Sequence, residues 1–146
     1  MGFSTTAAFA IIMISLFISM SFIAGELVKN FNELNLAVKE QEHRKYELEN
    51  TDFEISSVYA WNTTISTYNI RIDLSNTGAV TLDSSKFTVI VDGIYYDNFT
   101  YNTSNFYPLE GLQIQINNLP GGEGSSHRLK VVAENGVERY TTFTVN

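Results

Sequence analysis

The sequence predicts an all-β immunoglobulin-like sandwich preceded by one long amino-terminal α-helix that combines a transmembrane part and a stalk. An uncharged apolar run occupies the first 25 residues, and the charged segment after it contains no Gly or Pro up to residue 50. Beyond residue 50, apolar and polar residues alternate with the period of a half-buried strand. The predicted parts are a transmembrane helix (1–25), a charged helical stalk (26–50) and an extracytoplasmic β-sandwich domain (51–146).

The first segment has no charged side chain between Gly2 and Gly25. About 20 apolar residues, each rising 1.5 Å, span a hydrocarbon layer of roughly 30 Å. A cleaved signal peptide is the alternative, but no Lys or Arg precedes the run, and Ile23-Ala24-Gly25 is a poor cleavage site. We therefore expect a retained, single-span membrane anchor.

The second segment carries six Glu between residues 26 and 50, interleaved with Lys and Arg, and it can continue the helix. Leu27, Phe31, Leu34 and Val38 recur at alternating spacings of four and three, which places them on one helical face. This stripe either packs on the following domain, lies in the membrane interface, or forms a parallel seam between two chains. The seam would make the protein a homodimer.

Alternating apolar residues after residue 50 predict about seven short strands, the number typical of an immunoglobulin-like sandwich. The expected inward-facing sets are Phe53 and Ile55; Tyr68, Ile70, Ile72 and Leu74; Phe87, Val89 and Val91; Leu112, Ile114 and Ile116; Leu129, Val131 and Ala133; Phe143 and Val145. The segment 94–101 adds a further strand. We expect no helix in this half, and we expect Trp61 in a loop or at the rim.

Turn signals separate these strands. In Asn76-Thr77-Gly78 we expect strained backbone conformations at the Asn and the Gly. Asp92-Gly93 predicts a turn, and Pro120-Gly121-Gly122 predicts a chain reversal. Asn135-Gly136 is the pair that favours a type I′ hairpin turn.

Two signals disagree about the side of the membrane on which the sandwich lies. All Lys and Arg near the apolar helix follow it, which favours a cytoplasmic sandwich. Three Asn-x-Ser/Thr acceptor sequences, at Asn62, Asn98 and Asn102, instead indicate an exported domain with sites for N-glycosylation, although such Asn residues also serve ordinary turns. Large domains translocate with little regard to nearby charge. We therefore expect the sandwich outside the cytoplasm.

Composition argues against several kinds of chemistry. A net charge of −7 gives little support to nucleic-acid binding, and the absence of Cys excludes disulfides and thiolate chemistry. His43 and His127 are expected to be solvated residues rather than bases or ligands. Asp83, Asp92 and Asp97 lie near turns without the spacing of a calcium loop. We predict no enzyme, no catalytic residue, no metal site and no cofactor.

Five stretches follow one another along the chain: the start "MGFSTTAAFAIIMI", the transition "ENTDFEI", "NTG" followed by "TL", and the late "NLPGGEG" and "ENGVERY". By these stretches and their order, the chain resembles the accessory protein F family of the archaellum, the archaeal flagellum, over essentially its whole length. The resemblance implies a membrane-anchored stator protein at the archaellum base, in the cell envelope, with its sandwich in the pseudo-periplasmic space. It also implies binding to the surface-layer protein and to other archaellum accessory or motor proteins.

Two other functions remain open. An archaellin or pilin-like filament subunit would share the apolar helix and the sandwich, but it needs a short basic leader, whereas Met1 directly precedes Gly2. A membrane-tethered ligand-binding receptor could use exposed tyrosines to stack on sugars. Its candidate residues are Tyr95, Tyr96, Tyr101 and Tyr107.

Overall fold

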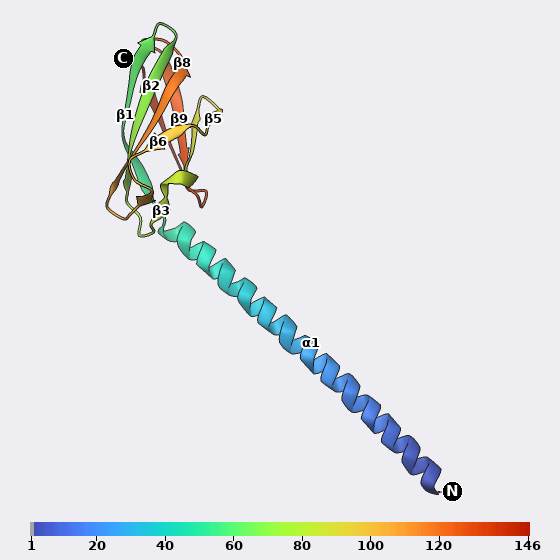
Figure 1. Cartoon of the computed structure of the whole chain (residues 1–146). Coiled ribbons are helices and arrows are strands. Elements are labelled where there is room, and N and C mark those ends of the chain that lie inside the picture. The colour runs from blue at the N-terminus through green and yellow to red at the C-terminus, as the bar shows by residue number, and fades with distance from the viewer. Residues whose placement is uncertain (1) are drawn as a thin grey trace. The chain divides into compact units, whose positions relative to one another are not determined.

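The computed structural model describes residues 2–146, with side chains from residue 5 onward (Figure 1). Helix α1 extends over Gly2–Asn50, which confirms the long amino-terminal helix. The chain divides into two compact units, one up to Arg44 and the other Lys45–Asn146. The last residues of α1 therefore belong to the unit that contains the strands.

The described residues after α1 form ten strands and one short 3₁₀ helix. Their bounds are β1 Phe53–Thr64, β2 Thr67–Asn76, β3 Leu82–Asp83, η1 Ser84–Lys86, β4 Thr88–Val91, β5 Ile94–Tyr96, β6 Phe99–Tyr101, β7 Asn105–Phe106, β8 Gly111–Pro120, β9 Ser126–Val132 and β10 Glu138–Thr144. The predicted count of about seven missed the two-residue strands β3 and β7 and took β5 and β6 as one strand over 94–101, and the expectation of no helix missed η1.

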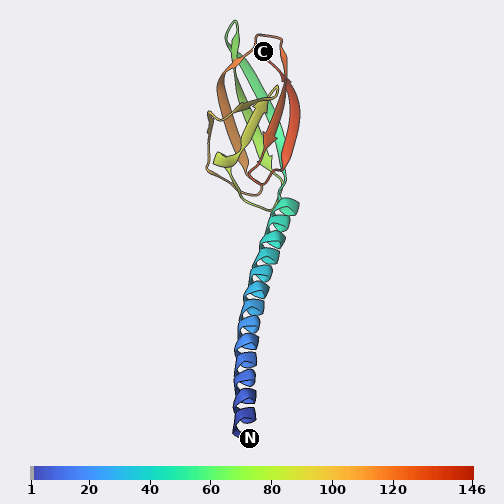
Figure 2. The same ribbon diagram turned by 90° about the vertical axis from the view of Figure 1, so that its right-hand side faces the viewer.

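The strands make two four-stranded antiparallel sheets, in the orders β1-β2-β8-β6 and β10-β9-β4-β5, while β3 pairs with β7. The strands β1, β2 and β8 lie side by side in Figure 1. At one margin β1 packs beside β10 of the other sheet (Figure 2). Asn146 closes this margin, because its N donates to Ala60 O and its O accepts from Asn62 N.

The core lies between the two sheets and is built from the residues that the alternation predicted. In β2, positions alternate strictly between half-buried and buried side chains, because successive side chains point to opposite faces of a sheet. The inward members of every predicted strand set are buried, except that Ile55 is only partly buried against the core. Phe87 adds edge-on ring contacts to Phe53 and Phe106. The predicted sandwich class is thus confirmed.

The turn at Asn135-Gly136 differs from the sequence expectation, whereas the one at Asp92-Gly93 agrees with it. In Asn135-Gly136 only the glycine has a positive φ, of 88°. This turn is therefore not type I′; it closes with a left-handed glycine between Ala133 and Val137, whose backbones are hydrogen bonded. Asp92 and Gly93 have φ of 50° and 84°, so that this pair, between Val91 and Ile94, carries the two positive φ angles that a type I′ turn needs.

The expectation of strained backbone at Asn76 and Gly78 is wrong, since neither residue is among those with positive φ in the described chain. Gly78 is needed for a different reason. A Cβ there would lie 2.4 Å from Asp52 N and 2.6 Å from Asn50 O, which no side chain can tolerate. Asn76 instead ends β2 with a side chain that is almost fully buried.

Candidate functional site

The amino-terminal half of α1 presents its apolar side chains to the surroundings. Every large apolar residue described there is exposed, and the segment from Thr5 qualifies by length and hydropathy as a helix able to cross a membrane. Ser15 Oγ donates to Ile12 O at 2.8 Å and Ser19 Oγ to Ser15 O at 2.9 Å. These bonds satisfy hydroxyls inside an apolar surface without any external partner.

The predicted stripe Leu27, Phe31, Leu34 and Val38 is exposed along its whole length. Val28 and Leu36 are also exposed, and at about 100° per residue they lie well off the stripe. The apolar surface of this segment is therefore wider than a two-chain seam requires. No described residue covers the stripe, so its role stays a prediction.

The link between α1 and β1 is held by the loop after β2. Gly78 N donates to Asp52 O and Ala79 N donates to Asn50 O, each at 2.8 Å. Asp52 also pairs with the guanidinium of Arg139 on β10. We call Asn50–Asp52 with its partners in the loop 77–79 the joint. Its close backbone packing, rather than a flexible Gly or Pro linker, connects the last helical turn to the sandwich.

The buried Asn76 organises this end of the sandwich. Its Nδ2 donates to Val80 O and to Phe106 O, each at 2.9 Å, and its Oδ1 accepts from Gly78 N at 3.0 Å. A buried amide that uses its donors and its acceptor in this way stabilises one loop arrangement. The sequence predicted a strained loop residue at Asn76; the signal for its buried role was its place at the end of an alternating strand.

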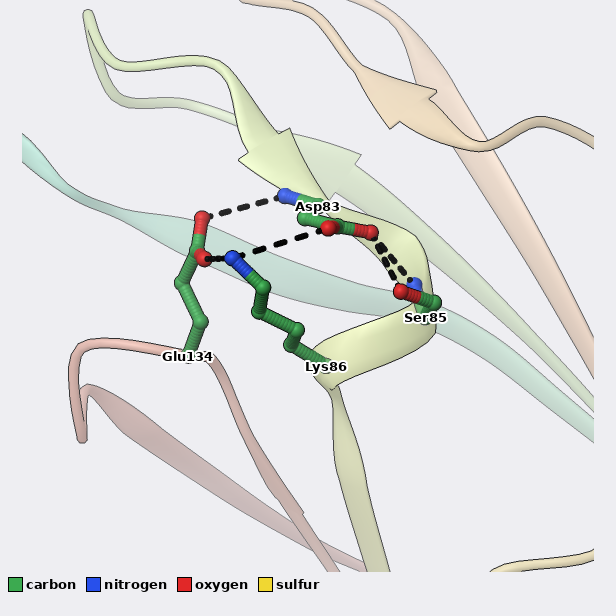
Figure 3. A network of polar contacts seen from close by, with 4 residues as sticks. All are labelled: Asp83, Ser85, Lys86 and Glu134. Carbon is green, nitrogen blue, oxygen red and sulfur yellow. Dashed lines mark hydrogen bonds and ion pairs between the residues drawn. The ribbon is translucent and has the colours of Figure 1, made fainter.

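A surface network joins η1 to the turn between β9 and β10 (Figure 3). Lys86 Nζ lies 2.9 Å from Glu134 Oε2 and 3.6 Å from Asp83 Oδ2, and Glu134 Oε1 accepts from Asp83 N at 3.1 Å. Hydrogen bonds from Ser85 lower the pKa of Asp83, and the hydrogen bond to Glu134 raises the pKa of Lys86. The arrangement is a structural bridge at a helix N-cap.

The expectation that His127 is a solvated residue is wrong. Only 11% of its side chain is exposed, and its ring stacks on Tyr68 and Phe143. Its Nδ1 lies 2.6 Å from Asp92 Oδ2 and its Nε2 lies 2.8 Å from Ser125 Oγ. The glycines of the 121–124 loop, which let the chain fold over this ring, were the available signal. His43, in contrast, lies on the exposed surface of α1.

These three residues lie in the order Ser125-His127-Asp92. Ser125 Oγ donates to Gly122 O, and the two ring nitrogens of His127 lie within hydrogen-bond distance of Ser125 Oγ and of Asp92 Oδ2. These contacts tie the loop before β9 to the turn at Asp92. The hydrogen bond from Arg128 N, followed by that from His127, lowers the pKa of Asp92. Burial raises the pKa of Tyr68.

The remaining candidate residues lie apart. Asn98 and Asn102 are exposed at the two ends of β6, whereas Asn62 lies half-buried within β1 with a buried Oδ1.

Trp61 lies in β1 rather than in a loop and is 39% exposed, outside the core. Among the proposed stacking tyrosines, Tyr96 packs partly against the core, while Tyr95, Tyr101 and Tyr107 are exposed. Within the described residues no His, Cys, Asp and Glu group could hold a metal ion.

A long apolar-to-charged helix followed by a two-sheet antiparallel sandwich defines a class of helix-anchored β-domain found in archaellum proteins. The chain belongs to the archaeal-type flagellin family, whose model matches residues 2–143. This match confirms the archaellum family predicted from the sequence. No curated protein matches the chain.

Solved archaellum structures share the fold. The archaellum periplasmic stator protein FlaG from Sulfolobus acidocaldarius has 20% identity and a TM-score of 0.50, covering 64% of this chain and 99% of that chain. The FlaF and FlaG stator complex of the same organism matches at 18% identity and a TM-score of 0.50, covering 62% and 87%. The archaeal flagellum of Methanospirillum hungatei strain JF1 matches at 12% identity and a TM-score of 0.58, covering 92% and 93%. At these identities the likeness establishes the fold alone.

Proposed function

We propose that the chain is a structural anchor of the archaellum motor, a stator component without enzymatic activity. Its apolar helix is held in the membrane, and its sandwich lies outside and binds the surface-layer protein. The observation that carries the proposal is the division of one helix into an exposed, uncharged half and a charged half that leads into a self-contained sandwich. The stator proteins among the solved relatives by fold add support.

A rotating filament needs such a part, because torque on the filament demands an equal reaction on something fixed. A single helix in lipid slides and rotates, so the reaction must pass to a stiffer structure. The joint at Asn50–Asp52 supports this role, since backbone hydrogen bonds and the Asp52–Arg139 pair leave no flexible linker between the last helical turn and β1.

Binding to the surface layer is tested by co-sedimentation. Full-length protein in mild detergent is mixed with purified surface-layer sheets, and the bound fraction is measured against sheets treated with an excess of the unlabelled protein. Saturable binding is expected. Recovery of the protein only in the supernatant, at every concentration, overturns the surface-layer part of the proposal.

The outward orientation has its own test. Protease added to cells stripped of their surface layer should cut the loop Gly121–Gly124 at its exposed residues Glu123 and Gly124. A mass increase at Asn98 or Asn102 should reveal glycosylation, more readily than at the half-buried Asn62. Digestion that requires lysis of the cells would place the sandwich in the cytoplasm.

A filament subunit is the second candidate, and a specific observation favours it. The matching family is named for flagellins, and the Methanospirillum flagellum covers 92% of this chain, helix included. An anchor should remain with membranes after filaments are sheared off, while a subunit should leave with them in stoichiometric amounts. Quantifying the chain in both fractions separates the two.

We also propose a homodimer through the stripe Leu27, Phe31, Leu34 and Val38. Two linked sandwiches on a repetitive lattice gain effective concentration, which can raise avidity by on the order of a hundredfold. Phe31→Glu together with Val38→Glu should make the detergent-solubilised chain monomeric in sedimentation. Val28→Glu, off the stripe, is the matched control. Equal effects of both changes would contradict a defined seam.

A further inference from the structure

The outer face of the sheet β1-β2-β8-β6 carries planar polar side chains in register. Strand pairing places Tyr59 opposite Arg71 and Arg71 opposite Gln115, and it places Ser57 opposite Asp73 and Asp73 opposite Gln113. Along β2 and β8 these residues alternate with fully buried ones, so they point away from the core. We call these six residues the amide face.

The polar groups of the amide face hold one another in place. Asp73 Oδ2 accepts from Ser57 Oγ at 2.7 Å, and Asp73 Oδ1 accepts from Gln113 Nε2 at 2.9 Å. Arg71 Nε lies 3.8 Å from Asp73 Oδ1, close enough for charge pairing but too far for a hydrogen bond. The face is therefore preorganised, and its one cation balances its one anion.

Hydrogen-bonding capacity remains unused on this face. The side chain of Arg71 is 40% exposed and its guanidinium makes no hydrogen bond within the described part of the chain; because its Nε is buried, its outer nitrogens are the ones that can meet a ligand. Gln115 Nε2 donates to Asn117 Oδ1 and Gln113 Nε2 donates to Asp73 Oδ1. The Oε1 atom of each Gln accepts no hydrogen bond within the described part of the chain. The face thus offers amide acceptors beside guanidinium donors, at a spacing set by the strands.

A shallow pocket and aromatic rings border the amide face. The pocket has a volume of about 200 Å³ and is lined by Thr100, Tyr101, Asn102, Gln113 and Gln115. This volume is below the roughly 300 to 1,000 Å³ of pockets that enclose a drug-sized ligand. It can seat one ring of a longer chain. On the opposite margin, Trp61 and Tyr59 stand on the edge strand β1, and Arg71 lies 4.7 Å over the ring of Tyr59.

We propose that the amide face binds saccharide chains carried by the surface layer, an inference that rests on the proposed anchoring function. Adjacent sugar hydroxyls both donate and accept, and planar amide and guanidinium groups meet such pairs with paired hydrogen bonds. Apolar sugar faces pack on aromatic rings such as Trp61. The balanced charge of Arg71 and Asp73 matches a neutral, hydroxyl-rich ligand. The three acceptor sequences predict that this protein works where N-linked saccharides occur.

The test uses full-length protein in mild detergent, made in a host without N-glycosylation so that Asn102 carries no saccharide of its own. Its binding to surface-layer sheets is compared with binding to sheets whose vicinal diols have been oxidised by periodate. The saccharide pool released from the same sheets is added as a competitor. Test variants are Gln115→Met and Arg71→Met, and Arg128→Met, an exposed cation on the other sheet, is the matched control.

We expect free saccharide to compete, periodate to abolish binding, and each test variant to bind about tenfold or more weakly, with the control and the melting temperatures of all variants close to wild type. Undiminished binding to oxidised sheets, without competition by saccharide, overturns the saccharide inference and leaves the anchor intact through a protein contact. Binding of released saccharide without binding to sheets overturns the anchor and retains the saccharide face. Binding to neither overturns both.

Discussion

Helix α1 and the sandwich use the same apolar residue types with opposite results. Phe17 in α1 is 62% exposed, while Phe106 in β7 is fully buried, and the same contrast separates the other apolar residues of the first half of α1 from the inward-facing residues of the sandwich core. The difference comes from the spacing of those residues, because alternation gives a sheet one apolar face that a second sheet can cover. A helix that is apolar all round needs an external cover. The sandwich supplies its own core, and the first half of α1 depends on lipid or on other chains.

The sharpest way to break this comparison is to separate the two units. The fragment 45–146 should remain monodisperse and folded in detergent-free buffer, whereas the full chain should aggregate unless detergent or lipid is present. Size-exclusion chromatography and circular dichroism measure both. An unfolded fragment would mean that the sandwich needs the apolar helix for its stability.

The second test compares equal substitutions in the two regions. Phe106→Ala should lower the free energy of unfolding of the sandwich by about 3 to 5 kcal/mol, because it opens a cavity between the sheets. Phe17→Ala should leave it unchanged. Trp61 is the single tryptophan of the chain, so that its fluorescence during urea unfolding in micelles reports on the sandwich alone. A comparable loss for both variants would contradict the independence of the core.

A third test compares two glycines, one in each region, and the expected change in the free energy of unfolding is smaller. Gly78→Ala should destabilise the sandwich by about 1 to 3 kcal/mol, since its Cβ would meet backbone atoms of the joint that cannot move aside. Gly25→Ala meets nothing within 4 Å and should leave the sandwich unchanged while it strengthens the helix. The same urea titration measures both variants. A neutral Gly78→Ala would show that the joint is looser than its hydrogen bonds indicate.

The smallest effect is a pH dependence confined to the sandwich. The pKa of Asp92 is lowered in the folded protein by the hydrogen bonds from Arg128 N and His127. Its contribution to stability is therefore present above the unfolded pKa, about 3.9, and is lost as the pH falls through the lower folded pKa. Asp92→Asn should reduce the loss of stability between pH 6 and 2, measured by urea unfolding. An unchanged pH profile would remove Asp92 from this role.

The sequence was most informative where a feature depends on local spacing. Strands β2 and β8 were predictable because each has three or more alternating apolar residues, and α1 because no helix breaker interrupts it. Strands β3 and β7 were not, since two residues carry no period and pair only after the loops 77–81 and 102–104 have been placed. Turn chemistry was predictable in position but not in type, as Asp92-Gly93 and Asn135-Gly136 demonstrate.

The candidate functional surfaces were harder to predict than the strands, because they form through contacts between segments that are distant in the sequence. From the sequence we expected His127 to be solvated, whereas its burial results from Tyr68 and Phe143, which lie on other strands. The amide face arises only when the register of β1, β2 and β8 aligns Arg71 with Gln115 and Tyr59. No pattern along the chain could reveal that alignment. The stripe on α1 stays a prediction, because it concerns a second molecule.

The hydrogen bonds between Asn146 and the β1 residues Ala60 and Asn62 have a consequence for biosynthesis. Their partners are separated by more than half of the chain, and contacts of such long range form slowly because a large loop must close first. The hairpin of β1 and β2 can form early, but one edge of β1 stays unpaired until Asn146 has been synthesised and has left the ribosome. During that interval the nascent domain has an unpaired strand edge, which is the state in which β-proteins are most prone to aggregate and most dependent on chaperones.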